Sequence, residues 1–232
     1  MRKKLIISVA IIAAISIASV ATLAVLHNKE KQAKKQENWA EIFKQHYEDR
    51  CAQFKEENKT AQDIDVVFLG DSLTEGYDVN KFYPQYKVLN RGIGGDTSFG
   101  VENRLDVSVY DANPKVTTLL IGANNFDTML NNYENILIDF KEKAPDMKVV
   151  LLSLTSMTME WGRNNEKARA NNIKIKEYSE KYNYSFVDLY NPLLDPATNE
   201  LRMEYTIDGG HLTEKGYEVV TAQITPVLET II

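Results

Sequence analysis

The fold of this chain is constrained most by five short, mostly apolar runs that alternate with segments of helical character. The runs cover residues 64–69, 87–90, 116–121, 148–154 and 184–188. Between them, apolar side chains recur at helical spacing in the groups Val101/Leu105/Val109, Ile136/Leu137/Phe140 and Ile173/Lys176/Tyr178 with Tyr182. Near-continuous apolar strands separated by helices are typical of a parallel sheet covered on both faces. We therefore predict an α/β fold with a five-stranded parallel sheet, closed by a helix over residues 213–232.

Polar or glycine-rich segments stand where such a sheet binds ligands. In open parallel sheets, ligands bind beyond the carboxyl ends of the strands. Three segments directly follow the first three runs, and a fourth precedes the closing helix: Gly70–Leu73, Asn90–Asp96, Gly122–Asn125 and Asp208–His211. The sequence thus predicts that all four segments lie along one rim of the sheet.

The residue types on this rim fit acyl transfer, which needs a nucleophile, a base, a group that orients the base, and donors for the oxyanion. Ser72 follows a strand and opens a predicted helix, where backbone N–H groups point outward. His211 is the only histidine after residue 58, and Asp208 stands three residues before it. Asn124 offers a side-chain donor, and the Gly94–Gly95 backbone can approach a substrate closely.

The four segments resemble the blocks of the SGNH hydrolases, also called the GDSL esterase/lipase family, across residues 64–220. Gly92–Asp96 is especially similar to the platelet-activating-factor acetylhydrolase-like branch, and Leu212–Tyr217 is a common continuation of the last block. Asn125 is a departure, because many members carry Asp there. The resemblance implies a flavodoxin-like three-layer sandwich without metal or cofactor, and a carboxylic ester hydrolase of the esterase or lipase type.

The resemblance also implies roles for single residues. Ser72 is expected to be the nucleophile, His211 the general base and then acid, and Asp208 the residue that orients His211. The oxyanion hole is expected to consist of the backbone N–H groups of Ser72 and Gly95 and the side chain of Asn124. An O-acyltransferase on the same site, or a non-catalytic surface-binding protein, is the alternative function.

Two further motifs are interpreted without catalytic chemistry. Asp71 is expected to make a structural hydrogen bond beside the nucleophile, because Asp favours helix caps. A dinucleotide-binding loop at Gly92 is disfavoured, since Thr97 stands where the third glycine would be. The first strand-to-helix turn also lacks the glycine-rich loop of a dinucleotide fold.

The sequence holds few indications of the substrate. The segment 155–165, with Met157, Met159 and Trp161, either lines an acyl or sugar pocket or packs as an ordinary loop. Small residues dominate the rim, which favours a short acyl group such as acetyl, carried on a glycan, a lipid or a small molecule. The sequence makes no prediction about the oligomeric state.

Composition argues against several other classes of protein. Residues 1–60 carry 11 Lys/Arg and 7 Asp/Glu, whereas residues 61–232 carry 16 and 26. A body this acidic is poorly suited to nucleic acid, whose binding depends on neutralising phosphates. The single cysteine, Cys51, excludes an internal disulfide, and three histidines leave little material for a histidine-built metal centre. The resemblance implies an ester substrate as the partner, and the acidic body argues against a nucleic acid.

The N-terminus predicts a membrane segment. Residues 5–26 contain no charged side chain and follow the basic residues 2–4. As a helix they would reach about 33 Å, enough for a hydrocarbon core of about 30 Å. This length favours an uncleaved signal anchor over a cleaved signal peptide, for which Ser19-Val20-Ala21 would be the cleavage site. We expect a cell-membrane protein with its catalytic domain outside, or a secreted protein if the helix is cleaved.

We divide the chain into a signal anchor or signal peptide (1–27), a charged helical connector (28–60) and an SGNH hydrolase catalytic domain (61–232). The connector carries an apolar stripe at helical spacing, with Ile42 beside Trp39, Phe43, Tyr47, Cys51 and Phe54. We expect this stripe to pack on the catalytic domain, and the alternative is a partner-binding or dimerising helix. His46 lies one position off the stripe and is expected to be a solvated helix residue.

Overall fold

The computed structural model describes residues 2–162 and 164–232, with the side chains of residues 2–26, 30 and 33 left out of the description. The chain divides into two compact units, one extending to Gln45 and the other comprising His46–Ile232. Helix α1 (Arg2–Asn58) contributes to both units. Within the described part of the chain, no helix is long and apolar enough to span a bilayer. The predicted anchor at residues 5–26 falls among the side chains outside this description.

The second unit is organised by a five-stranded sheet in the order β2-β1-β3-β4-β5. Its strands are β1 (Val66–Gly70), β2 (Val88–Gly92), β3 (Val116–Leu120), β4 (Lys148–Leu152) and β5 (Ser185–Val187). All neighbouring strands are parallel, and Val66 of β1 pairs in register with Val88 and Val116. This is the flavodoxin-like strand order. The prediction of a flavodoxin-like, five-stranded parallel sheet is confirmed.

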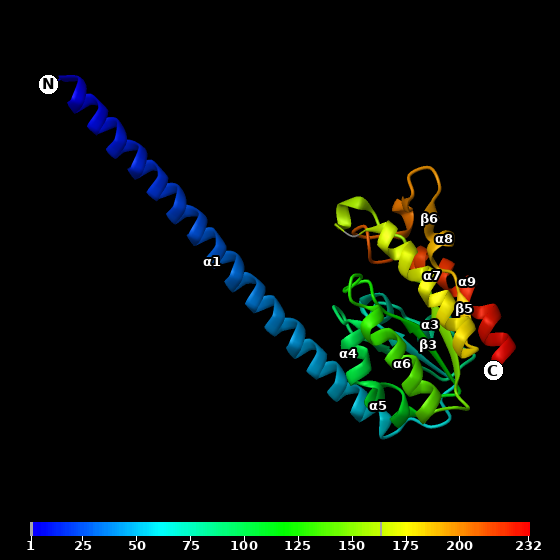
Figure 1. Ribbon diagram of the computed structural model, residues 1–232. Coiled ribbons are helices and arrows are strands. Elements are labelled where there is room, and N and C mark those ends of the chain that lie inside the picture. Colours follow the sequence, from blue (N-terminus) through cyan, green and yellow to red (C-terminus); the bar gives the residue numbers. More distant parts are fainter. Residues whose placement is uncertain (1, 163) are drawn as a thin grey trace. The chain divides into compact units, whose positions relative to one another are not determined.

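Helices cover both faces of the sheet, as the apolar strands require. They are α2 (Ser72–Glu75), α3 (Val79–Phe82), α4 (Ser98–Asn103), α5 (Leu105–Ser108), α6 (Leu130–Lys143), α7 (Asn165–Tyr182), α8 (Tyr190–Leu193) and α9 (Glu214–Ile231), with short 3-10 turns η1 (Tyr110–Ala112), η2 (Met159–Trp161) and η3 (Met203–Tyr205). A small antiparallel pair, β6 (Leu194–Asp195) and β7 (Glu200–Leu201), lies outside the main sheet. In Figure 1, α6 (green), α7 (yellow) and α9 (red) are the long helices of this unit.

Alternate residues of the strands pack into two separate hydrophobic cores, one on each face of the sheet. Val67 and Leu69 of β1 pack with α4, α5, α6 and α7. Val66 and Phe68 point to the other face and pack with α2, α3, α8 and α9. Because successive side chains of a strand point to opposite faces, one apolar run supplies both cores. This arrangement leaves the strand ends as the places where polar side chains can gather.

Two helical segments differ from their sequence patterns. The stretch from Val101 to Val109 forms two short helices, α4 and α5, because Arg104 between them leaves helical geometry with φ −122° and ψ 17°. In α7, Ile173 is 61% exposed, and the buried positions include Asn171 instead. The Asn171 amide is satisfied by donating to the carbonyl of Phe126 at 3.0 Å, so a polar residue can face the core there.

The apolar stripe on α1 behaves differently along its length. Phe54 is fully buried, and the Tyr47 hydroxyl donates to the carbonyl of Gly100 at 3.0 Å. This end of the stripe therefore packs on the sheet-containing unit, as expected. Trp39 and Phe43 are about half exposed, and their rings contact one another with centroids 6.0 Å apart. The boundaries at residues 27/28 and 60/61 stay a prediction.

Candidate active site

The candidate nucleophile lies where β1 passes into α2. Asp71 caps α2, and its buried carboxylate accepts a hydrogen bond from the backbone N–H of Leu73 at 3.0 Å. The structural role expected for Asp71 is thus confirmed. Gly70 allows the tight turn, since a Cβ there would lie 2.2 Å from Thr74 Oγ1 and 2.3 Å from the carbonyl oxygen of Leu120. Ser72 is consequently presented as the first residue of the helix, at the carboxyl edge of the sheet.

The structure brings Ser72, His211 and Asp208 into one chain of hydrogen bonds. His211 Nε2 lies 2.9 Å from Ser72 Oγ, across 139 residues of sequence. His211 Nδ1 lies 2.7 Å from Asp208 Oδ2. This is the nucleophile–base–orienting group arrangement that activates a serine. All three catalytic residues expected from the sequence are therefore together at the rim.

The Asp208 carboxylate is held in its ionised form. Partial burial raises its pKa, but hydrogen bonds from the His211 ring and from the backbone N–H groups of His211 and Gly210 outweigh burial. The net result is a pKa of Asp208 below the usual value for an aspartate. The two backbone hydrogen bonds, at 2.8 and 3.0 Å, both reach Oδ1 and leave Oδ2 for the imidazole.

The loop that carries His211 is fixed by a threonine that the sequence analysis did not single out. Thr206 Oγ1 donates to the carbonyl of His211 at 2.7 Å and accepts from the backbone N–H of Gly209 at 2.8 Å. Thr206 also forms an isolated antiparallel bridge with Leu212. Gly209 adopts φ +98°, a conformation that favours glycine. These contacts fix the backbone of the loop that carries the imidazole.

Two of the expected oxyanion donors lie on neighbouring loops. Gly95 occupies a turn closed by a 3.1 Å hydrogen bond from the N–H of Asp96 to the carbonyl of Ile93, with φ +79° at Gly95. The Asn124 amide donates to the carbonyl of Asp96 at 2.9 Å, which ties the two loops together. An Asn side chain carries two N–H groups, so it can serve this contact and a second acceptor.

Asn125, the departure from the family pattern, joins the same two loops. Its amide donates to Ser98 Oγ at 3.0 Å, and its carbonyl oxygen accepts from the backbone N–H of Ser98 at 3.4 Å. Ser98 begins α4, directly after the glycine segment. An amide at position 125 thus supports the arrangement of the candidate oxyanion donors without itself reaching the nucleophile.

A small cavity opens beside the nucleophile. Its volume is about 20 Å³, and Asn124, Thr155, Met157 and Trp161 line it together with Ser72 and other residues of the site. That volume is close to what one water molecule needs. Met157 is buried, whereas Met159 is 78% exposed and is not among the lining residues.

Trp161 packs directly on the candidate base. Its ring meets the His211 imidazole edge to face, with centroids 4.8 Å apart. A Cβ at Gly210 would lie 2.4 Å from the Trp161 ring, so a side chain at this position would displace the indole. The sequence left open whether residues 155–165 line a pocket or simply pack. Met157 and Trp161 do line the cavity, and Trp161 also restrains the imidazole.

Arg104 joins the nucleophile and glycine segments from below the rim. Its buried guanidinium donates to the carbonyl of Gly70 at 2.9 Å, to the carbonyl of Arg91 at 3.0 Å and to Asp96 Oδ2 at 2.8 Å. Sequence reasoning missed Arg104, because an arginine within a helical pattern normally indicates a solvated face. Its only sequence signal is its place between the apolar residues Val101 and Leu105.

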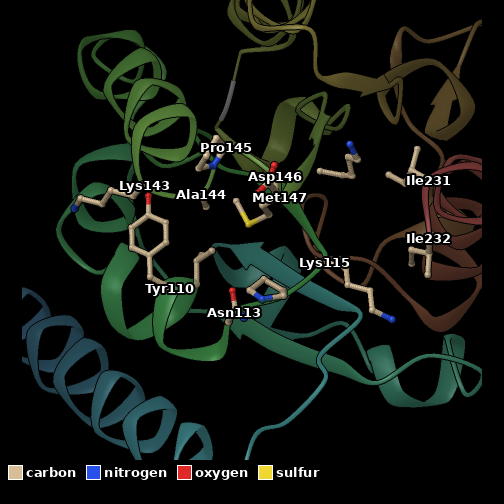
Figure 2. A pocket seen from close by; sticks show the side chains of 13 residues that line it. Tyr110, Asn113, Lys115, Lys143, Ala144, Pro145, Asp146, Met147, Ile231 and Ile232 are labelled. Carbon is tan, nitrogen blue, oxygen red and sulfur yellow. The ribbon is translucent and has the colours of Figure 1, made fainter.

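A larger hollow lies at the other end of the sheet. It measures about 540 Å³ and is lined at the amino ends of β3 and β4 by Lys115, Met147 and Lys148, with Tyr110 and Ile232 at its sides (Figure 2). None of the residues at the rim described above lines it. Within the described part of the chain, no cluster of three or more His, Cys, Asp or Glu side chains could hold a metal ion.

Comparison with known proteins places this geometry in a family. A family model described as the GDSL-like Lipase/Acylhydrolase family matches residues 68–219. A comparison with curated proteins found no match. Among solved structures, a Streptococcus pneumonia protein provisionally assigned as a platelet activating factor is 26% identical, with a TM-score of 0.79, covering 84% of this chain and 99% of that one. A GDSL-like lipase from Bacteroides thetaiotaomicron is 25% identical, with a TM-score of 0.70, covering 78% and 98%.

An acetyl xylan esterase from Geobacillus stearothermophilus shares the fold at 18% identity, with a TM-score of 0.58 and coverage of 73% of this chain and 96% of that one. The matched region contains the nucleophile turn, both candidate oxyanion loops and the histidine loop. The chain is therefore a carboxylic ester hydrolase that belongs to the GDSL-like lipase/acylhydrolase family.

Proposed function

We propose that the protein hydrolyses short-chain carboxylic esters through a Ser-His-Asp triad and an acyl-enzyme. The single observation that carries this proposal is the hydrogen-bond chain from Ser72 Oγ through His211 to Asp208, with distances of 2.9 and 2.7 Å. Ser72 attacks the ester carbonyl while His211 Nε2 takes the hydroxyl proton. His211 then donates that proton to the leaving alcohol, and Asp208 stabilises the imidazolium.

Hydrolysis is completed by the reverse sequence with water. His211 accepts a proton from water as the water attacks the acyl-enzyme, and returns it to Ser72 Oγ as the acid leaves. We assign the backbone N–H groups of Ser72 and Gly95 and the Asn124 amide to the oxyanion that forms in both steps. One such donor is typically worth about 3–4 kcal/mol of transition-state stabilisation.

We propose a short acyl group, such as acetyl, as the preferred substrate portion. The hollow beside Ser72 measures only about 20 Å³, and the buried Met157 side chain lines it. The indole of Trp161 further narrows the space next to His211. The alcohol, whether glycan, lipid or small molecule, would then extend outward from the rim.

The test is hydrolysis of aryl esters of increasing acyl length by the detergent-purified full chain, beside Ser72→Ala. We expect acetate esters to be turned over fastest, and Ser72→Ala to lower kcat by about 10⁶-fold, as for other serine triads. Equal or faster turnover of long-chain esters would contradict the short-acyl proposal. Undiminished activity of Ser72→Ala would overturn the triad. Ester formation with a sugar acceptor would instead indicate an O-acyltransferase.

We further propose that residues 5–26 form an uncleaved signal anchor that holds the catalytic unit outside the cell. The support is the length of the uncharged run and the basic residues before it. Protease treatment of intact cells should release the catalytic unit, and complete protection without permeabilisation would contradict this orientation. N-terminal sequencing of the mature protein distinguishes the anchor from a secreted form cleaved near Ala21.

A further inference from the structure

The last part of α1 contacts the loop of residues 92–96 through one carboxylate, that of Glu75. Glu75 ends α2, three residues after the nucleophile, and its Oε2 accepts a hydrogen bond from the backbone N–H of Gly94. His46 Nε2 lies 3.0 Å from the same oxygen, and Arg50 Nε lies 3.5 Å from Oε1. His46 is on a helix with its side chain 39% exposed, and helix packing also brings it against Glu75, 29 positions away.

These groups lie directly over the turn that holds the candidate oxyanion donor. A Cβ placed on Gly94 would lie 3.0 Å from Glu75 Oε2 and 3.6 Å from His46 Nε2. The next peptide unit carries the N–H of Gly95, and Gly95 adopts φ +79° in this turn. The Gly94 N–H belongs to the peptide unit just before the one that presents the Gly95 N–H, so its hydrogen bond to Glu75 holds the start of this turn.

A second set of contacts from the same helix holds the strand before the turn. The Arg50 guanidinium donates to the carbonyl of Gly92 at 3.0 Å through one terminal nitrogen. Phe54, one turn further along α1, is fully buried beneath the guanidinium groups of Arg50 and Arg91, at 4.8 and 4.6 Å from its ring centroid. The α1 segment is thus anchored firmly enough to act as a fixed support for Glu75.

We propose that Glu75 and His46 are positioning residues for the oxyanion hole: His46 orients the Glu75 carboxylate, which in turn aligns the Gly94–Gly95 turn. The turn of α1 that carries His46 then supports the oxyanion hole and is more than a spacer. This inference rests on the proposed oxyanion role of Gly95. Because an oxyanion donor acts only when negative charge develops, a misaligned donor lowers kcat and leaves KM nearly unchanged.

The test uses the full chain in detergent, with kcat and KM measured for an aryl acetate. Glu75→Ala should lower kcat by about 10- to 100-fold, as small misplacements of catalytic groups do. His46→Ala should lower kcat by about 3- to 10-fold, within the range expected for an indirect contact. His46→Gln, which can still donate to Glu75, should recover most of the loss. Lys55→Ala, an exposed substitution on the same helix, is the matched control.

A double variant separates positioning from general structural support. If His46 acts through Glu75, then adding His46→Ala to Glu75→Ala should cause no further fall in kcat. Additive losses, a rise in KM with constant kcat, or an unchanged kcat in Glu75→Ala would each overturn the inference. Thermal unfolding is followed for every variant, and Glu75→Gln, which keeps an acceptor for Gly94, provides the test if Glu75→Ala fails to fold.

The outcome is distinguishable from failure of the proposed function. If Ser72→Ala retains activity, the triad itself is wrong and the positioning role falls with it. If Ser72→Ala is inactive while the Glu75 and His46 variants match the wild-type kcat, the triad stands and only the positioning role is rejected.

Discussion

The two ends of the parallel sheet differ in the size of their hollows and in the residue types that line them. At the carboxyl end, a cavity of about 20 Å³ is surrounded by a serine, a histidine and an amide donor. At the amino end, a hollow of about 540 Å³ is lined mainly by lysines, prolines and aliphatic side chains (Figure 2). Of these two hollows, the smaller one holds the candidate catalytic groups.

The physical reason for the difference is the direction of the strands. Three loops leave the sheet at its carboxyl end, and the loop before α9 that carries His211 meets them there, so polar groups from distant parts of the sequence come together. At the amino end the lysines form exposed ion pairs, as with Lys143, which lies 3.2 Å from Asp139 one helical turn away. Substitutions at the two ends should consequently have different effects, on activity at one and on stability at the other.

The largest expected effect in this comparison is that of Asp208→Asn. The amide keeps the size of the side chain but no longer stabilises the imidazolium, and kcat should fall by about 10⁴-fold, less than for Ser72→Ala. Asp146→Asn at the amino end is the matched control and should leave kcat unchanged. Steady-state kinetics on an aryl acetate measure both variants, and a comparable loss in the two would break the distinction between the ends.

The second largest effect is expected for Arg104→Met, which should lower the free energy of unfolding and also remove contacts that hold the loops of the candidate active site. Removing the guanidinium leaves the buried Asp96 carboxylate without its 2.8 Å ion-pair partner. Breaking a buried pair in this way costs about 3–5 kcal/mol of unfolding free energy. Lys143→Met, which breaks an exposed pair at the amino end, should cost only about 0.3–0.5 kcal/mol. Urea unfolding measures both, and equal costs would contradict the contrast.

Mild acid should remove activity without unfolding the carboxyl end. A general base must be in its neutral form to accept the Ser72 proton, so kcat/KM should be lower in acid than at neutral pH. The pKa of Asp208 is lower in the folded protein than in the unfolded chain, so the ionised carboxylate stabilises the fold above the ordinary aspartate pKa. This contribution to the free energy of unfolding is lost only as the pH falls through the lowered pKa of the folded state. Circular dichroism recorded alongside the pH–rate profile should show an intact fold. An activity optimum near about pH 4 would contradict a histidine base.

The smallest expected effect is that of Tyr110→Phe at the amino end. The Tyr110 hydroxyl donates to Asp139 Oδ2 at 2.8 Å, and desolvation together with this contact raises the pKa of Tyr110. Loss of one such hydrogen bond should cost about 1 kcal/mol of unfolding free energy. The kcat should stay at the wild-type value, because the hollow contacts no residue of the triad. A fall in kcat would mean that the two ends are coupled.

Much of the fold follows from local pattern. The apolar runs at 64–69 and 116–121 predict strands that the structure places at 66–70 and 116–120. The closing helix begins at Glu214 with Thr213 as its cap, within one residue of the predicted start. These features are readable because burial on both faces of a sheet demands continuous apolar runs, and because helix caps use a few residue types.

Several supports of the site could not be predicted in this way. Arg104 reaches Gly70 across 34 residues, and His46 reaches Glu75 across 29. Each is a polar residue in a helical segment, for which the sequence pattern indicates a solvated face. Trp161 was ambiguous for a related reason, since an aromatic residue in a loop serves packing and binding equally well.

The sequence by itself determined the α/β class, the five strands and the order in which the four polar segments follow them. Strand order along one sheet then brings those segments to one edge, because parallel strands all end on the same side. Only the tertiary structure decided which polar side chains hold Ser72, His211 and the glycine turn in place. Those contacts depend on side-chain directions between helices and loops far apart in the chain, and no local pattern of residues encodes them.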